Sequence, residues 1–262
     1  MNRRPLNLKL KTVNSKLVMN KTEIQASWNN IRTISRRELQ SYFNSAIAYV
    51  VIVVFLAIIG WFHTSNLFLA NIATMRLMFE LVPLVFLFVV PAITMRLLSE
   101  EKKSGTIELL TTKPLHDYEI VFGKFLAAWA LVGVALLLTL VYYLTITSIG
   151  KIDNGPVVGG YFGLMLTAGV YVAIGLFASS LTENQVIAFI IGFVFVFVLF
   201  MLDKILIYVP ESLASIVEFL GIDYHFSNIA RGVIDTRDAM YFLSLIGFML
   251  YLTVLSLGRR RW

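Results

Sequence analysis

The sequence predicts an all-α polytopic membrane protein, because both its composition and its hydropathy pattern depart from those of soluble domains. Of its 262 residues, 58% are hydrophobic and 15% are charged, and the mean hydropathy is +0.79. Soluble domains carry about 25% charged and about 45–50% apolar residues. The apolar residues form long continuous runs rather than short alternating segments, which predicts membrane helices and not a closed barrel.

Six apolar runs are each close to the length of about 20 residues that crosses the hydrocarbon of a bilayer. They cover residues 46–62, 77–95, 122–148, 157–181, 186–207 and 240–257. The third run is long enough to tilt or to extend beyond the lipid. Residues 46–262 therefore form a predicted transmembrane domain of six helices.

The segment before the first span divides into two parts. Residues 1–22 are basic and poor in apolar residues, so we expect a mobile, solvated tail. Residues 23–45 predict an amphipathic helix that lies in the membrane interface and leads into the first span. Its apolar stripe contains Ile24, Trp28 and Ile31, and its polar side contains Arg32, Arg36, Arg37 and Glu38. An ordinary polar linker is the alternative, because the stripe is imperfect.

Positive residues near the span ends predict the orientation. With the N-terminus inside, and with the six basic residues of the N-terminal tail left out, eleven lysines and arginines lie on the inner side and five lie on the outer side. The inner set is Arg32, Arg36, Arg37, Arg96, Lys102, Lys103, Lys113, Lys124, Arg259, Arg260 and Arg261, and the outer set is Arg76, Lys151, Lys204, Arg231 and Arg237. We expect both termini, and the loop between spans two and three, to face the cytoplasm.

That loop, residues 96–115, concentrates charged residues among leucines. Gly105 can end one short helix, and Thr106 can start another with Glu108 in its first turn. Pro114 stops the second helix. The pattern predicts two small amphipathic helices that lie flat where the membrane meets water, with a solvated loop as the alternative.

The longest predicted outer segment is residues 208–239. It begins with Pro210, a favourable helix start, and continues with an amphipathic stripe. We expect short helices that lie on, or dip into, the outer boundary of the bilayer.

Motifs of catalysis are absent from the sequence. Gly123 and Lys124 lack the earlier glycine of a phosphate-binding loop and are followed by Phe125, so this chain should not hydrolyse nucleotides. His63, His116 and His225 are scattered over different loops, which predicts no metal site. Basic residues flank the apolar runs instead of forming one patch, which favours lipid head groups over nucleic acid. We expect no catalytic, cofactor or metal site.

Two charged residues lie inside the predicted spans, Glu80 near an outer end and Lys124 near an inner end. Both can reach the interface by extending their side chains, which favours a structural role. An ion-coupled transporter would more often place a carboxylate near the midplane. Gly159 and Gly163 have the spacing of small residues in closely packed membrane helices.

Three stretches resemble the ABC-2 type transporter permease family: residues 36–43 before span one, 96–114 after span two and 224–238 before span six. The resemblance extends over residues 30–262 in consistent order. Within the family, the sequence looks most similar to permeases associated with bacterial gliding motility. It implies a multi-pass, non-catalytic permease subunit of a bacterial inner membrane, which moves an unidentified substrate, by export. ATP would be bound and hydrolysed by a separate ATPase subunit, and a second permease subunit, identical or different, would lie alongside.

The resemblance also implies two sets of site residues. The element that contacts the ATPase would contain Arg96, Glu100, Glu101, Gly105, Thr106, Glu108 and Pro114. An external helical cap would contain Arg231, Gly232 and Asp235. Two other functions remain as alternatives: an ATP-independent carrier or channel, and a membrane scaffold for an envelope machine.

Overall fold

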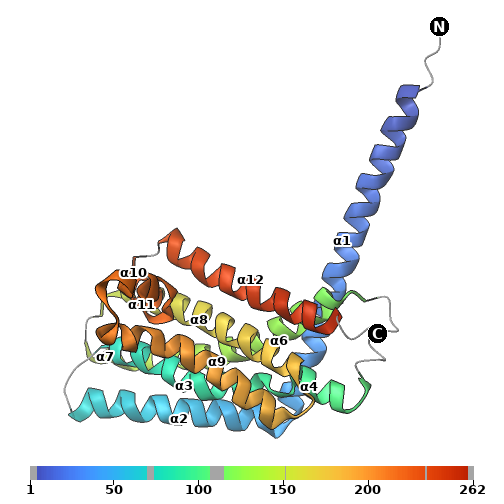
Figure 1. The fold of residues 1–262 in the computed structure, drawn as a ribbon. Helices are drawn as coiled ribbons and strands as arrows, with labels where there is room; N and C mark the ends of the chain where they lie inside the picture. Colours follow the sequence, from blue (N-terminus) through green and yellow to red (C-terminus); the bar gives the residue numbers. More distant parts are fainter. Residues whose placement is uncertain (1–4, 70–73, 107–114, 151, 234, 259–262) are drawn as a thin grey trace.

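The computed structural model describes residues 5–69, 74–106, 115–150, 152–233 and 235–258, and all regular structure in these ranges is helical. Six segments there are long and apolar enough to cross a membrane, which confirms the predicted fold class. These segments run roughly alongside one another as a bundle, and a long N-terminal helix leaves one end of it (Figure 1).

The six spans follow the predicted order. They are α2 (Ala46–Leu69), α3 (Arg76–Thr94) continued by α4 (Arg96–Lys103), α6 (Asp117–Leu138) continued by α7 (Leu140–Ile149), α8 (Asn154–Leu181), α9 (Gln185–Ile205) and α12 (Thr236–Gly258). Several helices begin before their apolar runs, because polar capping residues start them. The side chains of Asp153, Asn184 and Asp235 accept hydrogen bonds from backbone N–H groups in the first turns of α8, α9 and α12.

Helix α8 is the centre of the bundle, because 83% of its most apolar stretch is buried, against 17% for α9 and for α12. Glycines bring its neighbours close. A Cβ atom at Gly160 would lie 2.3 Å from the ring of Phe79 on α3, and one at Gly159 would lie 2.2 Å from the carbonyl oxygen of Ile229. The predicted close packing of this glycine-rich span is confirmed.

The sequence predicts that the helix after span two lies flat in the interface. In the structure this helix, α4, instead prolongs α3. Met95, between α3 and α4, keeps helical backbone angles (φ −52°, ψ −33°), and Arg76–Lys103 forms one membrane-length run. Gly105 has a positive φ of 69° and follows the last turn of α4, as predicted for a helix stop. The second predicted helix, with Glu108 and Pro114, lies outside the described residues.

Helix α1 (Pro5–Asn44) begins within the segment for which the sequence predicts a mobile tail, and no separate tail precedes residue 23 in the described chain. The mobility of residues 1–22 stays a prediction. From its contact with α6, α1 crosses the end of the bundle at a steep angle to the spans (Figure 1). This is the direction expected of a helix in the membrane interface, which also stays a prediction.

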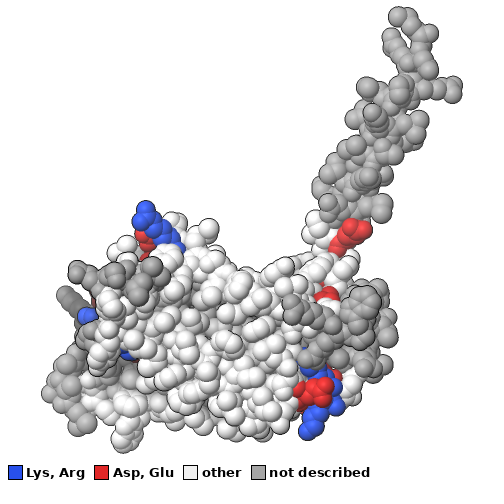
Figure 2. Space-filling model, in the orientation of Figure 1, with Lys and Arg blue, Asp and Glu red and all other residues white. Residues whose placement is uncertain are grey.

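At the opposite end of the bundle, a 3₁₀ turn (Leu206–Tyr208) leads into α10 (Glu211–Leu220) and α11 (Ile222–Ala230), so the predicted short helices between spans five and six are confirmed. α11 packs on α8 and α9. Charged side chains gather at the two ends of the bundle, and a broad uncharged belt separates them on the face shown in Figure 2. The ends of α4 and α12 and the bundle contact of α1 share one end, called here the α4 end; the other is the α11 end (Figure 1).

Candidate functional site

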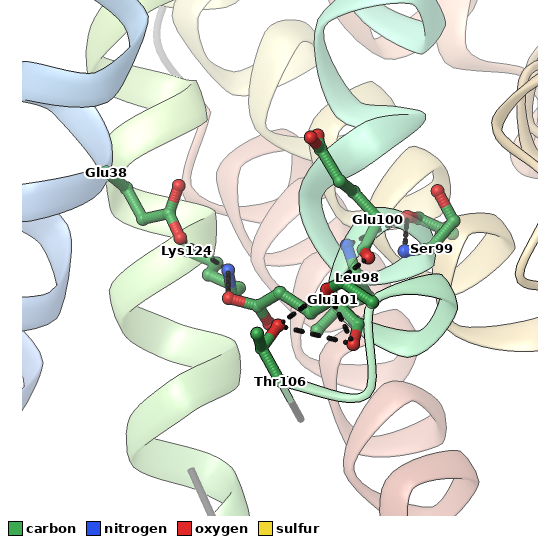
Figure 3. Close-up of polar contacts among 9 residues, drawn as sticks. Glu38, Leu98, Ser99, Glu100, Glu101, Thr106 and Lys124 are labelled. Carbon is green, nitrogen blue, oxygen red and sulfur yellow. Dashed lines mark hydrogen bonds and ion pairs between the residues drawn. The ribbon is translucent and has the colours of Figure 1, made fainter. Parts of the chain in front are cut away.

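The α4 end is organised around one buried lysine of α6. Lys124 has a side chain that is 2% exposed, and its ammonium group forms ion pairs with two carboxylates. Glu38 of α1 lies on one side of it, and Glu101 of α4 lies on the other, with Oε1 at 2.7 Å from Nζ (Figure 3). A single side chain thus joins an N-terminal helix, a span and the continuation of another span.

This cluster does not balance its charges, because two carboxylates share one ammonium group. The Oε2 atom of Glu101 is buried and has no hydrogen-bond partner in the described part of the chain. Charged groups away from water depend strongly on their ion partners, and removal of one partner leaves an uncompensated charge. The ion pairs of Lys124 therefore fix the positions of α1 and α4 relative to α6.

A second connection ties the start of α4 to α8. The hydroxyl oxygen of Ser179 accepts hydrogen bonds from the backbone N–H groups of Leu98 and Ser99, both at 3.0 Å, and donates to the carbonyl oxygen of Met95 at 2.9 Å. One turn further along, the ammonium group of Lys102 donates to the carbonyl oxygen of Ser180. Side chains and backbone of α8 thereby satisfy polar groups at the break between α3 and α4.

Helix α1 holds the same region from the other side. The hydroxyl group of Tyr42 donates to the carbonyl oxygen of Ile93 at 2.9 Å, and the guanidinium group of Arg96 lies 4.8 Å from the Tyr42 ring centre. Burial raises the pKa of Tyr42 well above its usual range, so the hydroxyl group stays a donor. Arg96, predicted as a coupling residue, is therefore part of an internal contact.

The start of α6 packs on α1 through further polar and close contacts. Asn30 donates to Oε2 of Glu119 at 3.1 Å, and the same oxygen accepts the backbone N–H of His116. A Cβ atom at Gly123 would lie 2.7 Å from the side chain of Ile34, so glycine is required for this approach. α1 and α6 consequently behave as one packed unit at the α4 end.

The predicted coupling residues divide into an internal and an exposed group. Arg96 and Glu101 make the contacts described above. Glu100, Gly105 and Thr106 are exposed, and the side chain of Glu100 points away from Lys124 (Figure 3). Glu108 and Pro114 lie outside the described residues. The exposed group offers a short polar surface at the end of a rigid helix, and the internal group connects that surface to the bundle.

The three predicted cap residues lie together between α11 and α12, at the other end of the bundle. Gly232 has a positive φ of 89°, and its backbone packs so closely on the start of α8 that a Cβ atom would lie 3.0 Å from Gly155. Asp235 caps α12 through the N–H of Arg237 at 2.9 Å. Arg231 is exposed at the end of α11.

The buried histidine at the α11 end has a structural explanation. In His225, Nδ1 lies 2.6 Å from Oδ1 of Asp238, and Nε2 lies 2.9 Å from the carbonyl oxygen of Phe219. Both ring nitrogens are thereby satisfied, and the ring ties α11 to α12. Among the described residues, no three His, Asp or Glu side chains converge as metal ligands.

Sequence reasoning partly missed the centre of this site. The expectation that Lys124 extends to the interface is wrong, because its side chain is buried and ion-paired. The charge of Lys124 within an apolar run indicated a residue of special importance. Its partners Glu38 and Glu101 could not be predicted, because they lie 86 and 23 residues away in the chain. Ser179 carried no signal, since serine is common in membrane helices. Glu80 is exposed and pairs with Arg76, as its predicted position near a span end allows.

The described chain is a bundle of six candidate membrane spans with an exposed polar helix end at α4, which is the architecture of a polytopic membrane protein. The model of the ABC-2 family transporter proteins matches residues 34–259, and this chain belongs to that family. Among curated proteins, none is significantly similar to this chain. The protein is therefore the non-catalytic membrane subunit of an ABC-2 family transporter, and such subunits generally pair with an ATPase subunit.

Proposed function

We propose that the α4 end is where this membrane subunit is driven by a separate ATPase subunit, and that this end faces the cytoplasm of a bacterial cell. The proposal rests on the different surroundings of two adjacent glutamates in α4. Glu100 is exposed, whereas the next residue, Glu101, is ion-paired to Lys124. The positive residues counted at this end support the inward orientation. The ATPase would contact the exposed group and would bind the ATP.

Movement of α4 would reach the bundle through the contacts of the internal group. Displacement of its first turn pulls on Ser179 of the central helix α8, and displacement of Glu101 pulls on Lys124 of α6. Glu38 extends the same connection to α1. Because α3 and α4 form one nearly continuous helical run, a force on Glu100 also acts directly along span two. Packed elements of this kind transmit small shifts without absorbing them.

A second permease subunit would complete the transporter. The most apolar stretches of α9 and α12 are 17% buried and that of α2 is 28% buried within this chain, which leaves apolar surface for lipid and for a neighbouring subunit. We propose export of a substrate through the assembled pair. The apolar walls do not select one substrate class, and the partner is either a copy of this chain or a related chain.

Charge reversal at the exposed glutamate tests the coupling role. Tagged full-length chain is purified from its native host in mild detergent, and the co-purifying ATPase is quantified together with its ATP hydrolysis. Glu100→Lys should remove most of the ATPase, because it reverses the charge that Glu100 presents on the contact surface without touching the buried ion pairs. Glu218→Lys, on α10 at the other end of the bundle, is the matched control and should retain it.

Two results would count against this proposal. One is an ATPase that co-purifies equally with Glu100→Lys and with the unchanged chain while transport continues. The other is substrate flux in vesicles that contain this chain alone, which would instead support an ATP-independent carrier or channel. If the chain still binds its partner proteins but no substrate transport can be measured, the result would support the alternative function of a membrane scaffold.

We propose gliding motility as the process served, on the basis of sequence resemblance alone. In a gliding host, deletion of this chain should stop gliding, and the Glu100→Lys variant should not restore it. Normal gliding in the deletion strain would separate this transporter from motility.

A further inference from the structure

A cavity of about 650 Å³ lies at the α11 end, between the start of α3, the start of α8, the end of α9 and α11. It is far from the ion pairs of Lys124, and the coupling of an ATPase does not involve it. We propose that this cavity binds the acidic head group of a membrane lipid, with Arg231 as the main cationic contact for that head group and an acyl chain lying along α9.

The floor of the cavity is apolar. It includes Phe79 of α3, Val157 of α8 and Phe226 of α11, which are between 3% and 6% exposed. Their packing is fixed by glycines of α8, since a Cβ atom at Gly163 would lie 3.0 Å from the Phe226 ring. A cavity with such a floor and a polar rim suits a ligand that is itself part apolar and part polar.

The charges on the rim are mostly satisfied by one another. Arg76 pairs with Glu80 at 3.1 Å, and Lys204 pairs with Asp223 at 2.7 Å. Asp153 accepts the backbone N–H of Gly155 as the cap of α8.

The remaining cation is Arg231, which is exposed and makes no ion pair with any side chain in the described part of the chain. A ligand that brings an anionic group to this rim therefore meets a guanidinium group that no carboxylate of the described residues pairs with, and guanidinium binds phosphate in a bidentate manner.

The depth of the cavity favours a lipid over a water-soluble anion. Arg76 begins one span, Asp153 caps another, and Lys204 ends a third, so the rim lies where hydrocarbon gives way to head groups. The volume accommodates a head group but not a complete lipid with two chains. The chains must therefore leave along the bundle surface.

An aromatic track on α9 leads from the cavity toward the middle of the spans. Phe200 lines the cavity, and Phe197 lies one turn earlier on the exposed side of α9. Phe193 and Phe189 continue the row, with ring centres 5.8 Å from Phe197 to Phe193 and 6.2 Å from Phe193 to Phe189. The stacked rings of Phe189, Phe193 and Phe197, one turn from Phe200 at the charged rim, fit an acyl chain attached to an acidic head group.

Photolabelling of the full-length chain tests the site without any ATPase. Nanodiscs of phosphatidylcholine receive a minor fraction of phosphatidylglycerol with a diazirine in its acyl chain, and the labelled peptides are mapped by mass spectrometry. Labelling should concentrate on the peptide around Phe197 and Phe200. Arg231→Gln should lower it about fivefold, as expected for one arginine at a membrane surface. Arg237→Gln, an exposed arginine outside the cavity, should leave it unchanged.

A second variant keeps the test decisive if Arg231→Gln proves unstable. Ser227→Trp fills the cavity without changing the charge, and it should also abolish the labelling of α9. Equal labelling by phosphatidylcholine with the same diazirine would overturn the proposal, and so would equal labelling in Arg231→Gln and Arg237→Gln. Complete competition by soluble glycerol phosphate would show a site for a free anion instead of a lipid.

Discussion

The ammonium nitrogen of Lys124 lies 2.7 Å from Oε1 of Glu101, so a buried cation of span three is bound directly to the helix that ends span two. The neighbouring residue Glu100 is exposed. Successive residues of a helix point in directions about 100° apart, which is why adjacent glutamates can have an internal and an external role. An exposed glutamate and a glutamate bound to the bundle thus lie within one helical turn of α4.

Loss of the buried cation should destabilise the protein strongly. Lys124→Met keeps much of the side-chain volume but leaves Glu38 and Glu101, each less than one quarter exposed, without their shared counter-ion. We expect a loss of about 3 kcal/mol in the free energy of unfolding, measured by thermal or denaturant unfolding in detergent. The triple variant Lys124→Met, Glu38→Gln, Glu101→Gln should recover most of this loss. A triple variant as unstable as Lys124→Met would show that packing, and not charge, sets the cost.

The hydroxyl group of Ser179 should control how firmly α4 is attached to α8. Ser179→Ala removes the acceptor for the N–H groups of Leu98 and Ser99, which are buried there, at a cost of about 1–3 kcal/mol. Hydrogen exchange of residues 96–103 should accelerate. Ser148→Ala is the control, because that hydroxyl group is exposed and bonds within its own helix, and its effect should stay below about 0.5 kcal/mol. Unchanged exchange in Ser179→Ala would show that other contacts hold α4.

Much of this fold was predictable from local sequence because a bilayer imposes length and hydropathy on each span. The run 157–181 corresponds to α8, Pro210 stands immediately before α10, and Gly105 follows α4, as predicted. The direction of α4 was not predictable. It depends on Ser179, which lies on a different span and bonds to backbone groups beside Met95. Local amphipathicity favours a helix that lies flat, but this tertiary contact keeps α4 in line with α3.

The candidate site was predictable in outline and not in its connections. The charge density of residues 96–103 predicts a contact region, and this stays a prediction, whereas the exposure of Glu100 and the ion pair of Glu101 follow from which face of α4 meets α6. The cavity at the α11 end could not be inferred from sequence, since its rim combines Arg76, Lys204 and Arg231 from three distant segments. Charges that are remote in sequence meet only after the helices have packed.

A methyl group at Gly159 should disrupt the packing of α8 on α11. Its Cβ atom would lie 2.2 Å from the backbone carbonyl oxygen of Ile229, which cannot move without displacing α11. Gly159→Ala should therefore lower the free energy of unfolding by about 1–3 kcal/mol. Gly247→Ala, on the exposed side of α12 with nothing within 4 Å, should be neutral or stabilising by up to about 1 kcal/mol, since alanine favours helices. Equal effects of the two changes would contradict the close approach at Gly159.

The orientation of the protein can be tested in a chain that contains no cysteine, so that single introduced thiols report without any background. Ser104→Cys places an exposed thiol at the end of α4, and Arg237→Cys places one at the start of α12, at the other end of the bundle. If the α4 end faces the cytoplasm, a membrane-impermeant maleimide added to intact spheroplasts should label Arg237→Cys at once. Ser104→Cys should react only after the membrane is permeabilised, because the bilayer keeps the reagent from that side. The reverse pattern would place the α4 end outside the cell, where no ATP-hydrolysing subunit could reach Glu100, and the proposed coupling would then be wrong.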